Sequence, residues 1–265
     1  MRISLRQTTS GMRACALLCG ALATTTAAAE SPLLDLVDSL DLNEFALSGE
    51  VFVAQSAYAG VDNSFVVYPL LRNFESSIDS DTILFGRGSY GGVRYVSDNN
   101  WTVGLVGKVQ TLGYGADDSE VFAGMDRRNW SLQAGATAGV RFDRLTLDFF
   151  ATSDLLNEHE GQEYELMVGR PFTFGNWQIV PQAGFRYQTS QFINHYFGVE
   201  EDEARPDRPA YAPGGATTSS ARLYWAWRFH PRWFMNLSTQ VSFLPDEIRN
   251  SPLVDRDTLW SFTAS

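Results

Sequence analysis

Strict alternation of apolar and polar residues over ten or more positions is the feature that most constrains how this chain can fold. The stretch 177–188 shows it clearly. Its first face carries Trp177, Ile179, Pro181, Ala183, Phe185 and Tyr187, and its second carries Gln178, Val180, Gln182, Gly184, Arg186 and Gln188. The stretches 130–142, 222–229 and 233–243 follow the same period of two. Because successive side chains of a strand point to opposite faces of its sheet, the pattern indicates β-strands.

The length of these strands favours a membrane protein over a soluble one. Strands of soluble proteins usually contain about 5–6 residues, whereas a tilted strand needs about 9–11 residues to cross a bilayer. Aromatic residues gather at the strand ends, where they would meet the lipid headgroups. A soluble β-sandwich also alternates, but its strands are shorter. The pattern therefore predicts an all-β fold, a transmembrane antiparallel up-and-down β-barrel.

Short and long connections between the strands alternate along the chain. The short ones are 97–100, 143–144, 175–176 and 230–232, and the long polar ones are 113–128, 155–161, 191–218 and 245–257. This is the arrangement of short periplasmic turns and longer acidic extracellular loops in a bacterial outer-membrane barrel. Counting 45–57 as the first strand and 258–265 as the last predicts about twelve strands. Ten is the alternative, because the short strand 82–86 has a weak signal.

The first 29 residues have the pattern of a cleaved secretory signal peptide. Arg2, Arg6 and Arg13 precede an apolar stretch at 14–22, and small residues at 27–29 predict cleavage before Glu30. The apolar stretch is too short to span a bilayer as a helix. The chain's two cysteines, at positions 15 and 19, both lie in this segment, so the mature protein is expected to lack disulfides and thiol metal sites.

Two further boundaries complete the predicted organisation. Residues 30–44 form a periplasmic lead-in, with Leu33, Leu36, Val37 and Leu40 at helical spacing. This segment is a short helix that plugs the lumen or contacts a periplasmic partner, or else a loosely ordered lead-in. Residues 45–265 form the barrel. The chain stops at Ser265 in mid-strand, and we interpret the last strand as truncated, because an open edge in lipid leaves backbone groups unpaired.

The polar face of the strands supplies the candidate functional residues. Directing the apolar face to lipid places charged side chains in the lumen: Arg94, Lys108, Arg141, Asp148, Glu163, Glu165, Arg186, Arg222 and Arg228. Rings of Arg or Lys favour a pore that prefers anions. The alternative is a network of ion pairs filling a narrow barrel. A barrel of about twelve strands lies between the filled small barrels and the open porins, which favours the network.

No residue pattern indicates catalysis, a cofactor or a metal. The three histidines are His159, His195 and His230, and no recognised catalytic motif accompanies them. His159 is interpreted as a solvated loop residue. The acids at 117, 118, 120 and 126 do not match a calcium loop. The four acids at 200–203 are expected to keep the loop 194–215 solvated, while Arg205 and Arg208 pair with neighbouring acids and fold it over the barrel mouth. The net charge of −11 excludes nucleic acid as a partner.

Four stretches resemble the MltA-interacting protein (MipA/OmpV) family of outer-membrane proteins. They are GYGADDSEVFAGMDRR (113–128), EGQEYELMVGRPF (160–172), NHYFGVEEDEARPDRPAYAPGG (194–215) and SPLVDRD (251–257). The resemblance extends from about residue 45 to the end. Asn250 replaces the Asp more usual before Ser-Pro, a mild departure.

The resemblance implies a barrel in the outer membrane of a Gram-negative bacterium, surrounded by lipid and lipopolysaccharide. The founding member is described as a scaffold that joins a murein transglycosylase to a penicillin-binding protein, and other members as porin-like proteins or adhesins. The expected function is therefore a non-catalytic scaffold for enzymes that synthesise and hydrolyse murein (peptidoglycan). The alternatives are a narrow porin-like channel with an arginine-lined lumen and a surface adhesin.

Overall fold

A computed structural model describes residues 45–73, 82–87, 89–97, 99–230 and 233–265. The predicted signal peptide (1–29) and lead-in (30–44) lie outside the described residues. The strands are β1 (Phe45–Ala54), β2 (Ser64–Asn73), β3 (Thr82–Arg87), β4 (Tyr90–Val96), β5 (Trp101–Gln110), β6 (Ser131–Phe142), β7 (Leu145–Asp154), β8 (Gln162–Gly169), β9 (Phe172–Phe174), β10 (Trp177–Gln188), β11 (Ala216–His230), β12 (Trp233–Phe243) and β13 (Thr258–Ala264).

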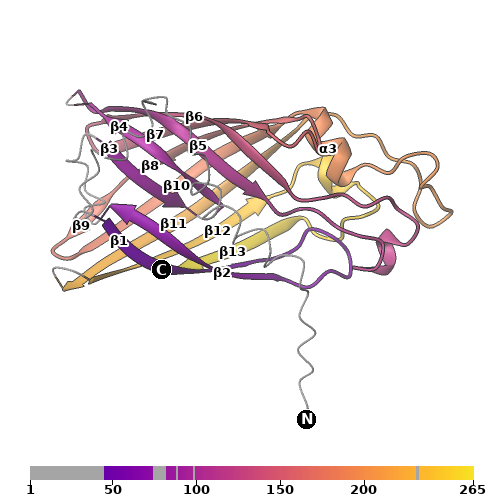
Figure 1. The fold of residues 1–265 in the computed structure, drawn as a ribbon, viewed down its shortest axis with the longest axis horizontal. Coiled ribbons are helices and arrows are strands. Elements are labelled where there is room, and N and C mark those ends of the chain that lie inside the picture. Colours follow the sequence, from indigo (N-terminus) through magenta and orange to yellow (C-terminus); the bar gives the residue numbers. More distant parts are fainter. Residues whose placement is uncertain (1–44, 74–81, 88, 98, 231–232) are drawn as a thin grey trace, which may run out of the picture. The chain divides into compact units, whose positions relative to one another are not determined.

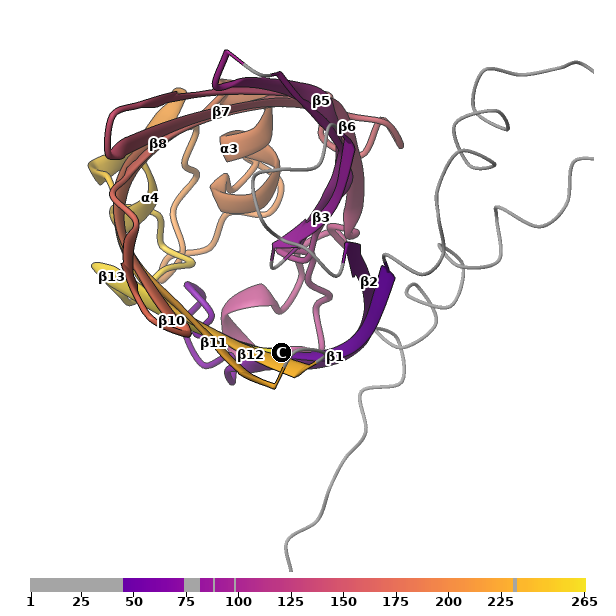
Figure 2. The same ribbon diagram turned by 90° about the vertical axis from the view of Figure 1, so that its left-hand side faces the viewer.

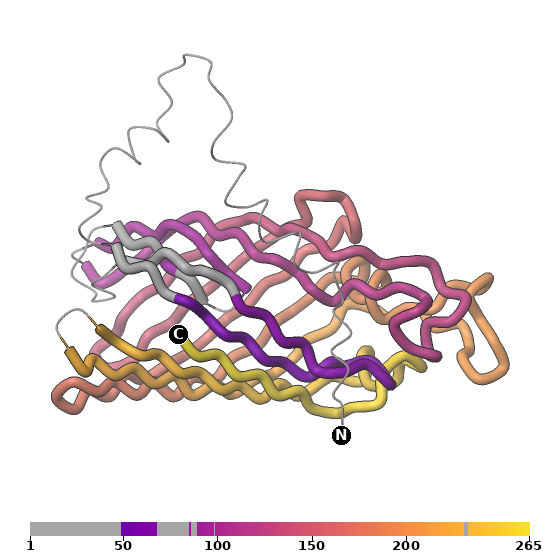
Figure 3. The backbone as a smooth tube through the Cα atoms, turned by 60° about the horizontal axis from the view of Figure 1, so that its bottom comes forward, coloured from indigo at the N-terminus to yellow at the C-terminus, as the bar shows by residue number. Residues whose placement is uncertain are grey.

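All of these strands belong to one antiparallel sheet, in the order β2-β1-β13-β12-β11-β10-β8-β7-β6-β5-β4-β3, with β9 paired to β10. Because β8 and β9 pair with successive parts of β10, they form one interrupted crossing, and the wall has the twelve crossings predicted. Figure 2, a view along the strands, shows the wall curving around a lumen. The last strand, β13, pairs with both β12 and β1, and Figure 3 shows it beside β1. Among the described residues, β2 and β3 form no ladder, so the sheet is open between them.

The connections fall at two ends of the wall, as Figure 1 shows. The turn end contains tight hairpins. In one of them Phe142 pairs with Leu145, and Asp143 between them has a φ of 49°, as a two-residue turn between twisted strands requires. The loop end contains the 3₁₀ helix η2 (Glu120–Phe122), α3 (Ser190–Phe197) and α4 (Asp246–Arg249). No helix in the described part of the chain is long and apolar enough to cross a membrane.

Two predicted boundaries were wrong. The first strand ends at Ala54 rather than Ala57, because Ala57 and Tyr58 turn inward and are buried. The longest loop ends before Ala216 rather than at Thr218, because β11 pairs with β10 from Gln188↔Ala216 onward. The long connections are therefore folded, and their bounds differ from the predicted ones by at most three residues at each end.

The outward face of the wall is apolar and fully suited to lipid contact. In β10 the exposed positions are the alternating apolar ones, whereas the inward positions are buried or half-buried. Trp177 stacks on Trp227 at 4.7 Å near the turn end, and Tyr164 lies 6.4 Å from Tyr187 near the loop end. These aromatic side chains lie where two interfacial girdles are expected.

A charge on this outward face should destabilise the barrel. Leu105, in the middle of β5, is 71 % exposed, and Leu105→Arg is expected to cost about 2–4 kcal/mol at the bilayer midplane. Urea unfolding in lipid vesicles measures the loss. Leu156→Arg is the matched control, because Leu156 is an exposed leucine on a loop outside the sheet. Equal effects of the two substitutions would contradict the assignment of this face to lipid.

Candidate functional site: a charged lumen beneath a folded cap

A buried network of charged side chains crosses the lumen near the loop end of the strands. Lys108 of β5 pairs with Glu163 of β8, and Arg186 of β10 lies 2.6 Å from Glu165 of β8. The hydroxyl of Tyr90 on β4 donates to Glu163 at 2.8 Å and is 3.2 Å from Glu165. Because β6 and β7 separate β5 from β8 in the sheet, the Lys108–Glu163 pair lies on the concave side of the wall.

The network satisfies its own charges. Lys108, Glu163 and Glu165 are buried, and the Arg186 guanidinium also approaches Glu163 at 3.6 Å. The second Glu163 oxygen accepts from Gln188 at 2.9 Å. Two cations therefore face two carboxylates, and neither carboxylate lacks a donor. Such pairing is what allows ionised groups to stay out of water.

The other candidate residues on the polar face are less closely connected. Arg94 lies 3.2 Å from Asp148 and over the ring of Phe85. Arg222 donates to the side-chain oxygen of Gln240. Arg141 is half-buried and Arg228 exposed near the turn end, and neither has an ion pair within the described part of the chain. Only Lys108, Glu163, Glu165 and Arg186 are thus gathered into one cluster.

Sequence reasoning missed two members of this cluster and one partner nearby. Tyr90 was not included, because a tyrosine near a strand end also fits an interfacial girdle. Gln188 and Gln240 are neutral, so an analysis of charge overlooked them. The alternation does place Gln188 on the same face as Arg186, and that signal could have identified it.

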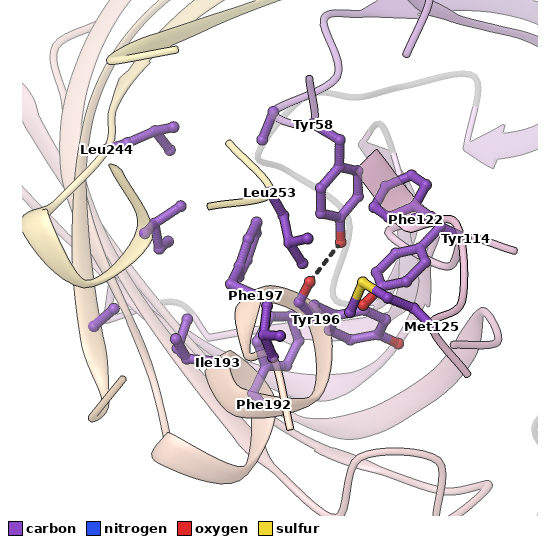
Figure 4. Close-up of a cluster of buried hydrophobic side chains, with 14 residues drawn as sticks. Tyr58, Tyr114, Phe122, Met125, Phe192, Ile193, Tyr196, Phe197, Leu244 and Leu253 are labelled. Carbon is purple, nitrogen blue, oxygen red and sulfur yellow. Dashed lines mark hydrogen bonds between the residues drawn. The ribbon is translucent and has the colours of Figure 1, made fainter. Parts of the chain in front are cut away.

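The connections at the loop end fold into a compact structure above the charged network, which we call the cap. The cap consists of the connections 55–63, 111–130, 155–161, 189–215 and 244–257. Fourteen buried apolar residues from the cap and adjacent strand ends form one cluster, drawn in Figure 4. Tyr114 stacks on Phe122 at 4.0 Å, and the Tyr58 hydroxyl donates to the Tyr196 carbonyl at 3.0 Å. In Figure 2, α3 lies inside the outline of the wall, so the cap covers part of the lumen.

Buried arginines connect the loops of the cap. Arg128 lies 2.9 Å from Glu203 and donates to the His195 carbonyl at 3.1 Å. Arg208, which is 1 % exposed, donates to the carbonyls of Glu203 and Ala123 at 2.6 and 3.1 Å. The acids of the loop 194–215 were expected to be solvated, and this expectation was wrong for Glu203, which is buried. The other acids of this loop, Glu200, Glu201, Asp202 and Asp207, are exposed.

The interpretation of His159 as a solvated residue was also wrong. Its side chain is buried against Phe192, with ring centroids 4.8 Å apart. Gly161 N–H donates to its Nδ1 at 2.9 Å, and its Nε2 is 3.0 Å from the Ser131 hydroxyl. His159 is buried because α3 of the cap packs against it. The short acidic sequence around His159 does not indicate this contact. His230, by contrast, is exposed at the turn end.

Burial also dominates the titration of the groups in the cap. It lowers the pKa of His159, and together with the positive charge of Arg128 it lowers the pKa of His195 to about 4. It raises the pKa of Tyr114 and of Tyr196 to about 12. The described residues contain no group of three or more His, Cys, Asp or Glu side chains suited to a metal ion.

The sequence matches the family described as MltA-interacting protein MipA over residues 47–265. The chain belongs to this family. It is 25% identical to outer membrane protein OmpV of Vibrio cholerae, with 84% of this chain and 90% of OmpV covered. It is 24% identical to the MltA-interacting protein of Escherichia coli K12, with 80% and 85% covered. A third relative, Omp26La of Vibrio anguillarum, is 29% identical over 56% of this chain and 57% of its own length.

Membership in the MipA family places the barrel in the outer membrane. The relatives named above are described as outer membrane or interaction proteins rather than as enzymes. A solved structure, OmpT of Vibrio cholerae, covers 85% of this chain with 6% identity and a TM-score of 0.34.

Proposed function

We propose that this protein is a non-catalytic barrel that holds murein-synthesising and murein-hydrolysing enzymes at the outer membrane. The observation that carries the proposal is the lumen network, in which Lys108 and Arg186 are neutralised by Glu163 and Glu165. An anion-selective pore would present uncompensated positive charge to the solute. The cap over the outer end of the lumen also favours a role other than wide solute passage.

A murein transglycosylase is the partner class that the relative named MltA-interacting protein supports. A penicillin-binding protein as a second partner, and contact with lipopolysaccharide around the wall, belong to the same proposal. Both enzyme classes act on murein, so the partner surface has to face the periplasm. This requirement selects the turn end of the barrel.

The turn end carries the charge for such a contact. Among the described residues of this end, Arg144, Arg170 and Arg228 are exposed, and the exposed acid Asp143 lies next to Arg144. The cap has the opposite character, with exposed acids at positions 200–202 and 246. A basic rim of this kind attracts a partner with an acidic surface and steers its approach.

The test is retention of a purified lytic transglycosylase by the barrel in lipid vesicles. We expect Arg144→Glu with Arg228→Glu to weaken retention by about tenfold, because two attractive charges become repulsive. Arg249→Glu with Arg256→Glu, at the cap end, is the matched control and should leave retention unchanged. Equal retention of the transglycosylase by both double variants would show that it does not bind through the arginines of the turn end.

The rival functions have distinct outcomes. Single-channel steps in a planar bilayer that decrease in Arg186→Glu would establish a solute channel and end the scaffold-only view. Loss of binding to surfaces after deletion of residues 199–211 would instead support an adhesin. We expect the wild-type protein to give no conductance steps at neutral pH.

A further inference from the structure

Two of the three histidines lie against each other in the cap. The rings of His159 and His195 are 6.1 Å apart. His159 belongs to the loop 155–161 between β7 and β8, whereas His195 lies in the last turn of α3. His159 also packs against Phe192 and Tyr196 of the same helix, at 4.8 and 5.6 Å. The pair therefore holds the loop and the helix together.

The hydrogen bonds of His159 require a neutral ring. Gly161 N–H donates to Nδ1 at 2.9 Å, so Nδ1 is an acceptor and carries no proton. Nε2 then holds the proton and donates to the Ser131 hydroxyl at 3.0 Å. Protonation of Nδ1 would place two donors face to face and break the bond that closes the 155–161 loop.

The neighbouring charges do not compensate for a second proton on either ring. The charged groups that face the pair are Asp154 of β7, Glu158 of the 155–161 loop, Lys108 of β5, Glu163 of β8 and Arg128 of the 111–130 connection. Asp154 is 3.9 Å from His159 Nε2, but its carboxylate already accepts three backbone N–H groups, from residues 156, 159 and 160. Glu163 is paired with Lys108. Arg128 adds a positive charge beside His195.

His195 is half-buried, and one of its two ring nitrogens, Nε2, is buried without a hydrogen-bond partner within the described part of the chain. Its ring packs edge-on to Tyr196 at 4.7 Å. When both histidines are charged, two cations lie 6.1 Å apart between ring centres, with Arg128 as a third beside His195.

We propose that His159 and His195 form an acid-sensitive latch, whose protonation separates the 155–161 loop from α3 and opens the cap over the lumen. The closed cap binds these protons more weakly than the open one, since burial lowers the pKa of both histidines. Acid therefore favours the open form. The transition begins below the ordinary histidine pKa of about 6.5 and extends toward the value of about 4 for His195. The outer end of the lumen becomes accessible only in acid.

A cysteine reporter tests the latch in the intact protein. Ala57 is 2 % exposed in the cap, and residues 30–265 contain no cysteine, so Ala57→Cys introduces a single buried thiol. Dithiodipyridine reacts with thiols in acid as well as at neutral pH. We expect its reaction with Cys at this position to accelerate at least tenfold between pH 7.5 and 4.5, relative to Ala212→Cys on the exposed part of the loop.

Histidine variants in the Ala57→Cys background assign the effect. His195→Phe keeps an aromatic ring without a titrating group, and should move the midpoint at least half a pH unit lower. His159→Asn keeps an acceptor for Gly161 N–H and should act in the same direction. His230→Phe, at the exposed turn end, is the matched control and should leave the midpoint unchanged. A pH-independent rate, or one midpoint shared by His195→Phe and His230→Phe, would overturn the proposal. Should His159→Asn fail to fold, His195→Phe decides alone.

Discussion

Lys108→Met is expected to lower the free energy of unfolding of the barrel by about 3 kcal/mol, the lower end of the range for breaking a buried ion pair. The substitution leaves Glu163 buried without its closest cation. Arg186 at 3.6 Å, Tyr90 and Gln188 still contact the carboxylate, so the loss stays near that lower end. Urea unfolding in lipid vesicles, followed by tryptophan fluorescence and by heat-modified gel mobility, measures the difference.

Two further variants separate the charge from the shape of the side chain. Lys108→Met combined with Glu163→Gln removes both charges, and should restore at least half of the loss, because no unpaired charge remains in the lumen. Arg141→Met is the matched control. Arg141 belongs to the same polar face of the strands but lies outside the ion-pair cluster. Its removal should therefore change the free energy of unfolding by no more than about 0.5 kcal/mol. If the double variant were less stable than Lys108→Met, the network would not be a compensated charge cluster.

The wall could be predicted from the sequence because its rule is local. Each strand can be recognised by its alternation of apolar and polar residues. The apolar residues face the lipid and the polar ones face the lumen, as Phe185 and Arg186 illustrate on β10. Even the weakly signalled strand β3 is present, as the alternation of short and long connections required. The direction of each strand followed from the same alternation.

The pairing within the lumen could not be predicted in the same way. The sequence places Lys108 and Glu163 on the inner face, but β6 and β7 lie between their strands. Whether they meet depends on the curvature and stagger of the whole wall. The alternation of residues along a strand gives no information on the curvature or the stagger of the wall.

The cap escaped prediction for a different reason. Its apolar cluster draws Tyr58, Phe122, Phe192 and Leu253 from four connections far apart in the chain, none of which has a regular period. Glu203 is one of four consecutive acids and looks like its neighbours in sequence. Only the fold brings it to Arg128 and buries it.

Arg128→Met is expected to release the cap while the wall stays folded, at a cost to cap stability of about 3–5 kcal/mol. Arg128 is the only side chain among the described residues that forms an ion pair with Glu203, at 2.9 Å, and it also holds α3 through the His195 carbonyl. Its removal leaves a carboxylate that is 5% exposed with backbone donors alone, from Asp126 and Glu200. Protease cleavage in the 199–211 loop should accelerate, because cleavage follows the population of the opened form.

Glu200 provides the matched control for Glu203, because Arg128 approaches both glutamates and only Glu203 is buried. Glu200, whose side chain is 71% exposed, lies 3.6 Å from Arg128, and an exposed pair of this kind contributes less than about 1 kcal/mol. Glu200→Gln should therefore leave the cleavage rate within about fivefold of the wild-type rate, whereas Glu203→Gln should raise it much further. The gel mobility of the folded wall should be unchanged in every variant, since the strands form their ladders without these side chains. Loss of the folded wall together with the cap in Arg128→Met would show that the two unfold as one unit, and would contradict a cap that opens on its own.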